Sequence, residues 1–98
     1  MPPTVTLIPL GASDPLPDSL FAGAFDPLTR REIEVARWVT ASKRNTEIAR
    51  ILGCGYRTVE KHVEHILEKL DVDARTAICG WFLQRLAQAG YWLPAPAK

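Results

Sequence analysis

The sequence lacks the excess of basic residues that nucleic-acid-binding domains usually carry. Its 98 residues include 12 Lys and Arg against 11 Asp and Glu, which leaves a formal net charge of +1. Because such domains attract phosphates with clustered positive charge, this balance argues mildly against nucleic-acid binding. The placement of the basic side chains, rather than their number, therefore has to decide the question.

Cysteine and long apolar runs are also scarce. The two cysteines, Cys54 and Cys79, do not form a CxxC motif, which argues against a disulfide framework or a zinc ribbon. We expect reduced, buried thiols. No apolar run approaches the roughly 20 residues that a membrane helix needs, and prolines interrupt the region where a signal peptide would be continuous. These features predict a cytoplasmic protein that does not engage a membrane.

Proline separates residues 1–27 from the rest of the chain. Six of the eight prolines fall there, and the region contains no basic residue. Proline opposes a continuous helix because it fixes φ and lacks a backbone donor. We expect an extended arm or linker. Within it, residues 5–10 could pair as a short edge strand, or Leu20, Phe21 and Phe25 could pack on the helical body.

Residues 28–90 are predicted to form an all-α body of four helices, followed by an extended tail at residues 91–98. Apolar residues recur at helical spacing throughout the body, and no strand-turn-strand pattern interrupts them. The first helix is expected at residues 29–41. Thr29 and Glu32 have the spacing of a capping box, in which each side chain satisfies the other residue's backbone donor.

The next two helices predict a helix-turn-helix. A short helix capped by Asn45 or Ser42 is expected to end at Gly53 in a left-handed conformation. A longer helix at residues 56–70 follows, with one apolar stripe made by Val59, Val63, Ile66, Leu67 and Leu70. A short helix, a glycine-containing turn and a longer helix, braced by an earlier helix, can present the polar face of the longer helix to a DNA major groove.

The polar face of residues 56–70 carries charges of both signs. Arg57 and Lys61 suit contacts with phosphate or guanine, and Thr58 suits a phosphate oxygen near the helix start. Positive charge is added at the preceding turn and short helix by Lys43, Arg44 and Arg50. This pattern is compatible with DNA binding, although any surface helix has one polar face.

Four blocks of the sequence resemble LuxR/GerE-type DNA-binding domains. They read LTRREIEV at residues 28–35, NTEIA at 45–49, LG followed by RTVEKH at 52–62, and ILEKLDV with Arg75 at 66–75. The blocks run in register without a gap to about Ile78. Four blocks in the right order are far more specific than one short motif.

The resemblance implies a four-helix domain whose third helix reads the major groove and whose fourth helix forms the dimer contact. It places DNA contacts at Thr46, Arg57, Thr58, Glu60, Lys61, Glu64 and Lys69, to which the basic Lys43 and Arg44 are added. Several positions depart from the family pattern. Glu60 and Glu64 replace residues that are often basic, Ser42 replaces a common glycine, and Gly55 replaces a Ser or Thr cap. A carboxylate repels phosphate but can accept a hydrogen bond from cytosine.

The fourth helix is expected at residues 74–89, capped by Asp73 and ended by Gly90. Its aromatic residues, together with Tyr91 and Trp92, either pack in the core with the N-terminal arm or form a binding surface, since aromatic anchors concentrate binding energy. The dimer or partner surface is predicted at Trp81, Phe82 and Arg85.

These features predict a non-enzymatic, sequence-specific transcription regulator that binds double-stranded DNA as a homodimer, with RNA polymerase as a further candidate partner. No cofactor is expected. His62 and His65 are three residues apart, but no third ligand is spaced to join them, so no metal site is predicted. The alternative is a protein-interaction module that keeps the fold while Glu60 and Glu64 weaken DNA binding.

Overall fold

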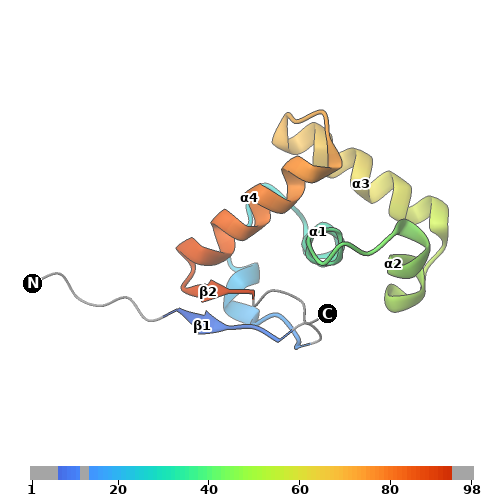
Figure 1. Cartoon of the computed structure of the whole chain (residues 1–98). Helices are drawn as coiled ribbons and strands as arrows, with labels where there is room; N and C mark the ends of the chain where they lie inside the picture. The colour runs from blue at the N-terminus through green and yellow to red at the C-terminus, as the bar shows by residue number, and fades with distance from the viewer. Residues whose placement is uncertain (1–6, 12–13, 94–98) are drawn as a thin grey trace, which may run out of the picture.

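The computed structural model describes residues 7–11 and 14–93 and confirms the all-α body. Its helices have these bounds: α1 Arg30–Thr40, α2 Asn45–Leu52, α3 Tyr56–Leu70 and α4 Arg75–Gln88. A single-turn 3-10 helix, η1 (Asp18–Phe21), precedes them. Two-residue strands, β1 (Ile8–Pro9) and β2 (Tyr91–Trp92), pair in parallel (Figure 1). None of the helices in these residues has the length and apolar character that a bilayer crossing requires.

The predicted capping of α1 is confirmed, whereas the predicted caps of α2 and α4 are wrong. The Thr29 hydroxyl accepts from the Glu32 backbone at 3.2 Å, and the Glu32 carboxylate accepts from the Thr29 backbone at 2.8 Å. Helix α2 has Arg44 at its N-cap instead of Asn45 or Ser42. Helix α4 has Ala74 there instead of Asp73, and no side chain caps it. At the start of α2 the Glu47 carboxylate accepts from the Arg44 backbone at 3.0 Å, so the local cap comes from the third helical residue and not from the N-cap side chain.

Left-handed backbone marks the turns on both sides of α2. Gly53 ends α2 with φ 67°, as its position predicted, and Gly90 follows α4 with φ 94°. Ser42, in the turn between α1 and α2, also has a positive φ, 64°. Left-handed backbone costs a residue with a Cβ roughly 1–2 kcal/mol, so glycine is favoured at such positions. The glycine that the family pattern usually has in place of Ser42 thus has a backbone reason.

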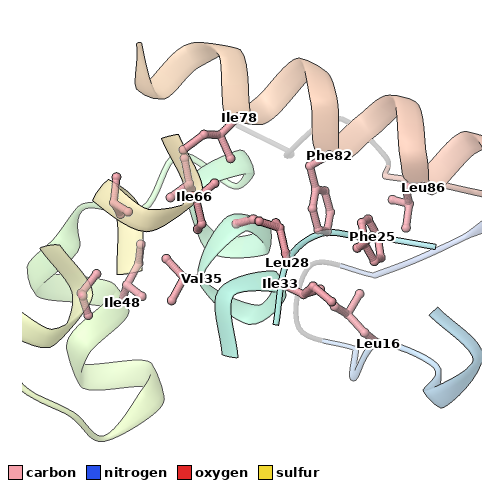
Figure 2. Close-up of a cluster of buried hydrophobic side chains, with 14 of the residues drawn as sticks. Leu16, Phe25, Leu28, Ile33, Val35, Ile48, Ile66, Ile78, Phe82 and Leu86 are labelled. Carbon is pink, nitrogen blue, oxygen red and sulfur yellow. The ribbon is translucent and has the colours of Figure 1, made fainter. Parts of the chain in front are cut away.

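The core surrounds α1, which Figure 1 shows nearly end-on among the other three helices. Val35 and Ala36 of α1 are completely buried. They meet residues of the other helices that are equally inaccessible, which Figure 2 shows together: Ile48 of α2, Ile66 of α3, Ile78 and Phe82 of α4. Each such side chain contributes roughly 1.5–3 kcal/mol through burial. This common core holds α2 and α3 in a fixed relation to α1.

Residues 14–27 pack on the helical body, which confirms the alternative in which Leu20, Phe21 and Phe25 contact it and shows that these residues are not a free linker. Leu20 and Phe25 are almost completely buried. The Phe25 ring stacks on Phe82 with a centroid separation of 4.8 Å and an interplanar angle of 11°. Phe82 is therefore a core residue, and its assignment to a dimer or partner surface is wrong (Figure 2).

The short strand and the extended tail predicted at the two ends of the chain pair with each other. The Ile8 backbone donates to the Gly90 carbonyl at 2.8 Å, and the Leu10 backbone donates to the Trp92 carbonyl at 2.9 Å. The remainder of the predicted strand, residues 5 and 6, and residues 94–98 of the predicted tail lie outside the described residues.

Candidate nucleic-acid interface

Helix α3 has one buried face and one exposed face. Val59, Val63 and Ile66 are buried against the other helices. On the other side, most of the predicted contact residues are exposed to solvent, while Glu60 is half-buried at the edge: Arg57, Thr58, Lys61 and Glu64. Because Arg57 and Lys61 are four residues apart, they lie one above the other on the same side of the helix. The structure thus brings the predicted α3 contacts together on one accessible surface.

The turn between α2 and α3 sets the direction of this surface. Gly53 adopts the left-handed conformation, and the Cys54 backbone donates to the Ala49 carbonyl at 3.0 Å, which closes the end of α2. Gly55 then occupies the N-cap of α3 in an extended conformation, without a side-chain cap. Cys54 is half-buried beside the core, and its thiol is therefore not fully buried as we expected.

The basic residues before α2 lie next to the start of α3. Lys43, Arg44 and Thr46 line an open hollow of about 650 Å³ together with Tyr56, the first residue of α3, and Arg75, the first residue of α4. Arg44, Thr46 and Tyr56 are exposed, and Lys43 is half-buried. The structure therefore joins the predicted contacts of the α1–α2 turn to the N-terminal end of the α3 surface. We call these two adjoining regions the α2–α3 face.

Lys69 does not join this group. Its ammonium lies 2.6 Å from a carboxylate oxygen of Glu32, whose side chain is only 4% exposed. Lys69 also lies three helical turns from Arg57, or about 18 Å along the helix axis. Its charge is committed to a buried carboxylate, so we assign Lys69 to stability and leave it out of the contacts proposed below.

Arg75 has contacts that sequence reasoning missed. Its guanidinium donates to the Asn45 side-chain oxygen at 2.5 Å and to the Lys43 carbonyl at 2.6 Å. Both acceptors lie some 30 positions away in the chain, so no local spacing could have indicated the bonds. The only available signal was that Asn45 and Arg75 both fall in the family-like blocks.

The remaining residues of the predicted partner surface lie on α4. Trp81 and Arg85 are half-buried, and the Arg85 guanidinium lies 5.2 Å from the centroid of the Trp81 ring. Leu83, which is 43% exposed, lies on roughly the opposite side of α4 from Trp81 and Arg85. Trp81 and Arg85 are thus partly accessible, in contrast to Phe82.

The two histidines of α3 do not converge on a common point with other ligands. His65 is exposed and His62 is half-buried. Across residues 7–11 and 14–93, no group of three or more His, Cys, Asp or Glu side chains could hold a metal ion.

A family model described as bacterial regulatory proteins, luxR family, matches residues 26–82. The chain is 36% identical over 61 residues to the nitrate/nitrite response regulator protein NarP of Escherichia coli, covering 62% of the chain and 28% of NarP. It is 41% identical over 51 residues to the transcriptional regulatory protein LiaR of Bacillus subtilis, covering 52% and 24%.

A third relative is the transcriptional regulatory protein UhpA of Escherichia coli. It is 39% identical to the chain over 67 residues, which is 63% of the chain and 34% of UhpA. The chain spans about a third or less of the length of these relatives.

Proposed function

The chain belongs to the luxR family of bacterial regulatory proteins, and from this premise we propose that it is a sequence-specific DNA-binding transcription regulator. In this proposal α3 enters the major groove and the α1–α2 turn contacts the adjacent phosphates. The single observation that carries the proposal is the α2–α3 face, where exposed basic and hydroxyl side chains of the turn and of α3 adjoin. Basic side chains are therefore clustered on this face, although the chain as a whole is nearly neutral.

The dimensions of α3 support insertion into the groove. Its 15 residues give a length of about 22 Å, and the major groove is about 12 Å wide, enough for one helix. Arg57 and Lys61 can reach guanine edges or phosphates from the outward side. Thr58, in the first turn, suits a phosphate oxygen at the positive end of the helix dipole.

The acidic residues of α3 restrict the DNA sequences that the proposed regulator would bind. Glu64 is exposed and Glu60 is half-buried beside the basic residues. A carboxylate in the groove accepts from the exocyclic amine of cytosine and repels a phosphate. We infer that Glu60 and Glu64 select the sequence by favouring cytosine at the positions they face and by lowering affinity for other duplexes.

Selection from random duplex DNA tests the function directly. The protein should enrich a defined sequence, and the enriched duplex should bind with an affinity that falls steeply with salt because phosphate contacts release counterions. Two half-sites at a fixed spacing would indicate a dimer. No enrichment, together with no retarded species at low salt, would overturn the proposal.

A protein-interaction module is the second candidate, favoured by the two carboxylates within the α2–α3 face. In that case the double substitution Glu60→Lys and Glu64→Lys should create DNA affinity that the parent lacks. Measurable binding of duplex DNA by the parent would reject this candidate. The same double substitution is then a control for the first proposal, since it should raise affinity but blur the sequence preference.

The remaining assignments follow from the regulator proposal. We infer a homodimer that pairs through α4, with Trp81 and Arg85 at the contact, and RNA polymerase as the partner if the protein activates transcription. Sedimentation of the protein, with and without the selected duplex, tests the dimer. We also place the protein in the cytoplasm, where its DNA target lies, and assign it no catalytic activity.

A further inference from the structure

The guanidinium of Arg75 connects α4 to the turn between α1 and α2. Nη1 donates to Oδ1 of Asn45 at 2.5 Å, and Nη2 donates to the backbone carbonyl of Lys43 at 2.6 Å. One planar group thus holds two points on either side of Arg44. Arg75 is half-buried in the wall of the hollow, where its bonds are partly shielded from water.

The turn that Arg75 grips is otherwise held by its own two helices. The Ser42 and Lys43 backbones donate to carbonyls near the end of α1, Val39 and Trp38, both at 3.0 Å. The Arg44 backbone donates to the Glu47 carboxylate of α2 at 3.0 Å. These bonds shape the turn locally. The Arg75 bonds add a third element, α4, and so fix the place of the turn relative to the whole body.

Resting on the proposed DNA-binding function, we propose that Arg75 is a positioning residue that holds Lys43, Arg44 and Thr46 in place for the DNA backbone. It does so through the Lys43 carbonyl and the Asn45 side chain. A turn that is already ordered loses less conformational entropy when it binds, so the affinity for phosphate rises.

The geometry of the guanidinium makes this role specific to arginine. Its planar fork presents two donors at a fixed angle, whereas a lysine ammonium is a compact charge on a flexible stem. Arg75→Lys therefore keeps the net charge of the protein but cannot donate to the Asn45 side chain and the Lys43 carbonyl at the same time. Arg31→Lys is the matched control, because Arg31 lies on α1 and forms an exposed ion pair with Glu34. It makes the same chemical change away from the turn.

The first test needs no DNA. Arg75→Lys should increase amide hydrogen exchange at residues 43 and 44, whose backbone N–H groups are hydrogen-bonded, by about 10-fold or more, which equals a loss of about 1.4 kcal/mol in local protection. Exchange in the centre of α1 should stay unchanged. Asn45→Ala, which removes an acceptor and leaves the guanidinium, should loosen the same residues and serves if the first variant unfolds. Unchanged exchange in both variants would overturn the inference.

The second test measures binding to the selected duplex over a range of salt concentrations. Arg75→Lys should bind about 10-fold more weakly and lower the salt slope by about 1, although its charge is unchanged, because a phosphate contact is lost. The double substitution Lys43→Ala and Arg44→Ala should weaken DNA binding strongly when it is made in the parent. The same double substitution should weaken binding much less when it is added to Arg75→Lys. Arg31→Lys should match the parent.

The outcomes separate this inference from the function on which it rests. If the parent binds no duplex, the proposed function fails, and the role of Arg75 in DNA binding fails with it, whatever the exchange shows. If the parent binds and the effects of Arg75→Lys and the Lys43–Arg44 substitutions simply add, the function stands and the positioning role is wrong.

Discussion

Glu32 carries two structural tasks with a single buried carboxylate. It closes the capping box with Thr29 and binds the ammonium of Lys69 at 2.6 Å. Burial by itself raises the pKa of Glu32, but the hydrogen bonds from Lys69 and from the Thr29 backbone outweigh burial and hold the pKa below its ordinary value of 4.5. The charged form is therefore the one that the folded protein favours.

This lowered pKa predicts a loss of stability in acid. A group whose pKa is depressed by folding stabilises the protein above its ordinary pKa, and this contribution is lost as the pH falls through the folded value. Glu32→Gln should lower the free energy of unfolding by about 2 kcal/mol at neutral pH. The difference between variant and parent should shrink below about pH 4.5. Denaturant titrations at several pH values measure it.

Glu34→Gln is the control for this effect. Glu34 forms an ion pair with Arg31 in which both side chains are substantially exposed. Such pairs contribute about 0–1 kcal/mol. An equal loss in both variants, or a Glu32→Gln effect that does not change with pH, would contradict the role assigned to Glu32.

Lys61 is the residue on which DNA affinity should depend most directly. Its side chain is exposed in the middle of the α3 surface and makes no ion pair among the described residues. Lys61→Ala should weaken binding of the selected duplex by about 10-fold, because a basic contact with DNA is lost. Fluorescence anisotropy of labelled DNA measures this effect. Arg31→Ala should leave affinity nearly unchanged, and equal losses in both variants would show that only net charge matters.

Among the elements, the turns on either side of α2 make the same demand on the backbone of one residue each. Ser42 has φ 64° and Gly53 has φ 67°, yet only the second position holds a glycine. Ser42→Gly should stabilise the protein by about 0.5–1 kcal/mol, since relief of left-handed strain exceeds the added flexibility of the unfolded chain. Gly53→Ala should destabilise by about 1 kcal/mol through the same strain.

Denaturant midpoints at equal slopes measure both turn variants. The Gly53 position is informative because a Cβ there would meet no atom within 4 Å, so backbone strain alone decides the result. A loss of stability in Ser42→Gly would mean that the serine side chain contributes a contact larger than the strain.

The elements themselves were largely predictable from the sequence. The bounds of α3 were predicted without error because its apolar stripe is long and regular, and α1 was marked by Thr29 and Glu32. The starts of α2 and α4 were predicted wrongly by one or two residues, because Arg44 and Ala74 occupy N-caps without the usual side-chain oxygen. Tertiary packing sets such starts, and local pattern does not record it.

The candidate site was predictable only in part, where regular helical spacing determines which side chains are exposed. Exposure of Arg57 and Lys61 followed from helical spacing. The commitments of Lys69 to Glu32 and of Arg75 to Asn45 did not, since each joins residues 30 or more positions apart. Phe82 was misplaced on the surface for a related reason. A helix pattern shows that a residue is apolar, but the partner that covers it comes from another part of the chain.

At the scale of the whole molecule, residues 14–27 are a structural part of the helical domain. Phe25 is fully buried and stacks on Phe82 of α4. Phe25→Ala should lower the free energy of unfolding by about 3–5 kcal/mol, which is the usual cost of deleting a buried ring. Thermal and denaturant unfolding measure the change.

Phe21→Ala provides the comparison within the same region. Phe21 is half-buried, and the Arg30 guanidinium lies 4.1 Å from the centroid of the Phe21 ring. Loss of the Phe21 ring should therefore cost about 1 kcal/mol. Equal stability of Phe25→Ala and the parent would mean that residues 14–27 lie on the domain without supporting it.

The pairing of β1 with β2 has a consequence for the order in which the protein folds during its synthesis. β1 is synthesised before the four helices, and its partner β2 follows only after them (Figure 1). On the ribosome, β1 therefore has no strand to pair with, and Phe25 has no Phe82 ring to stack on, until α4 and β2 have left the exit tunnel. Nascent chains arrested before residue 80 should be cut by protease near Phe25, whereas chains lengthened by a linker that carries β2 out of the tunnel should resist.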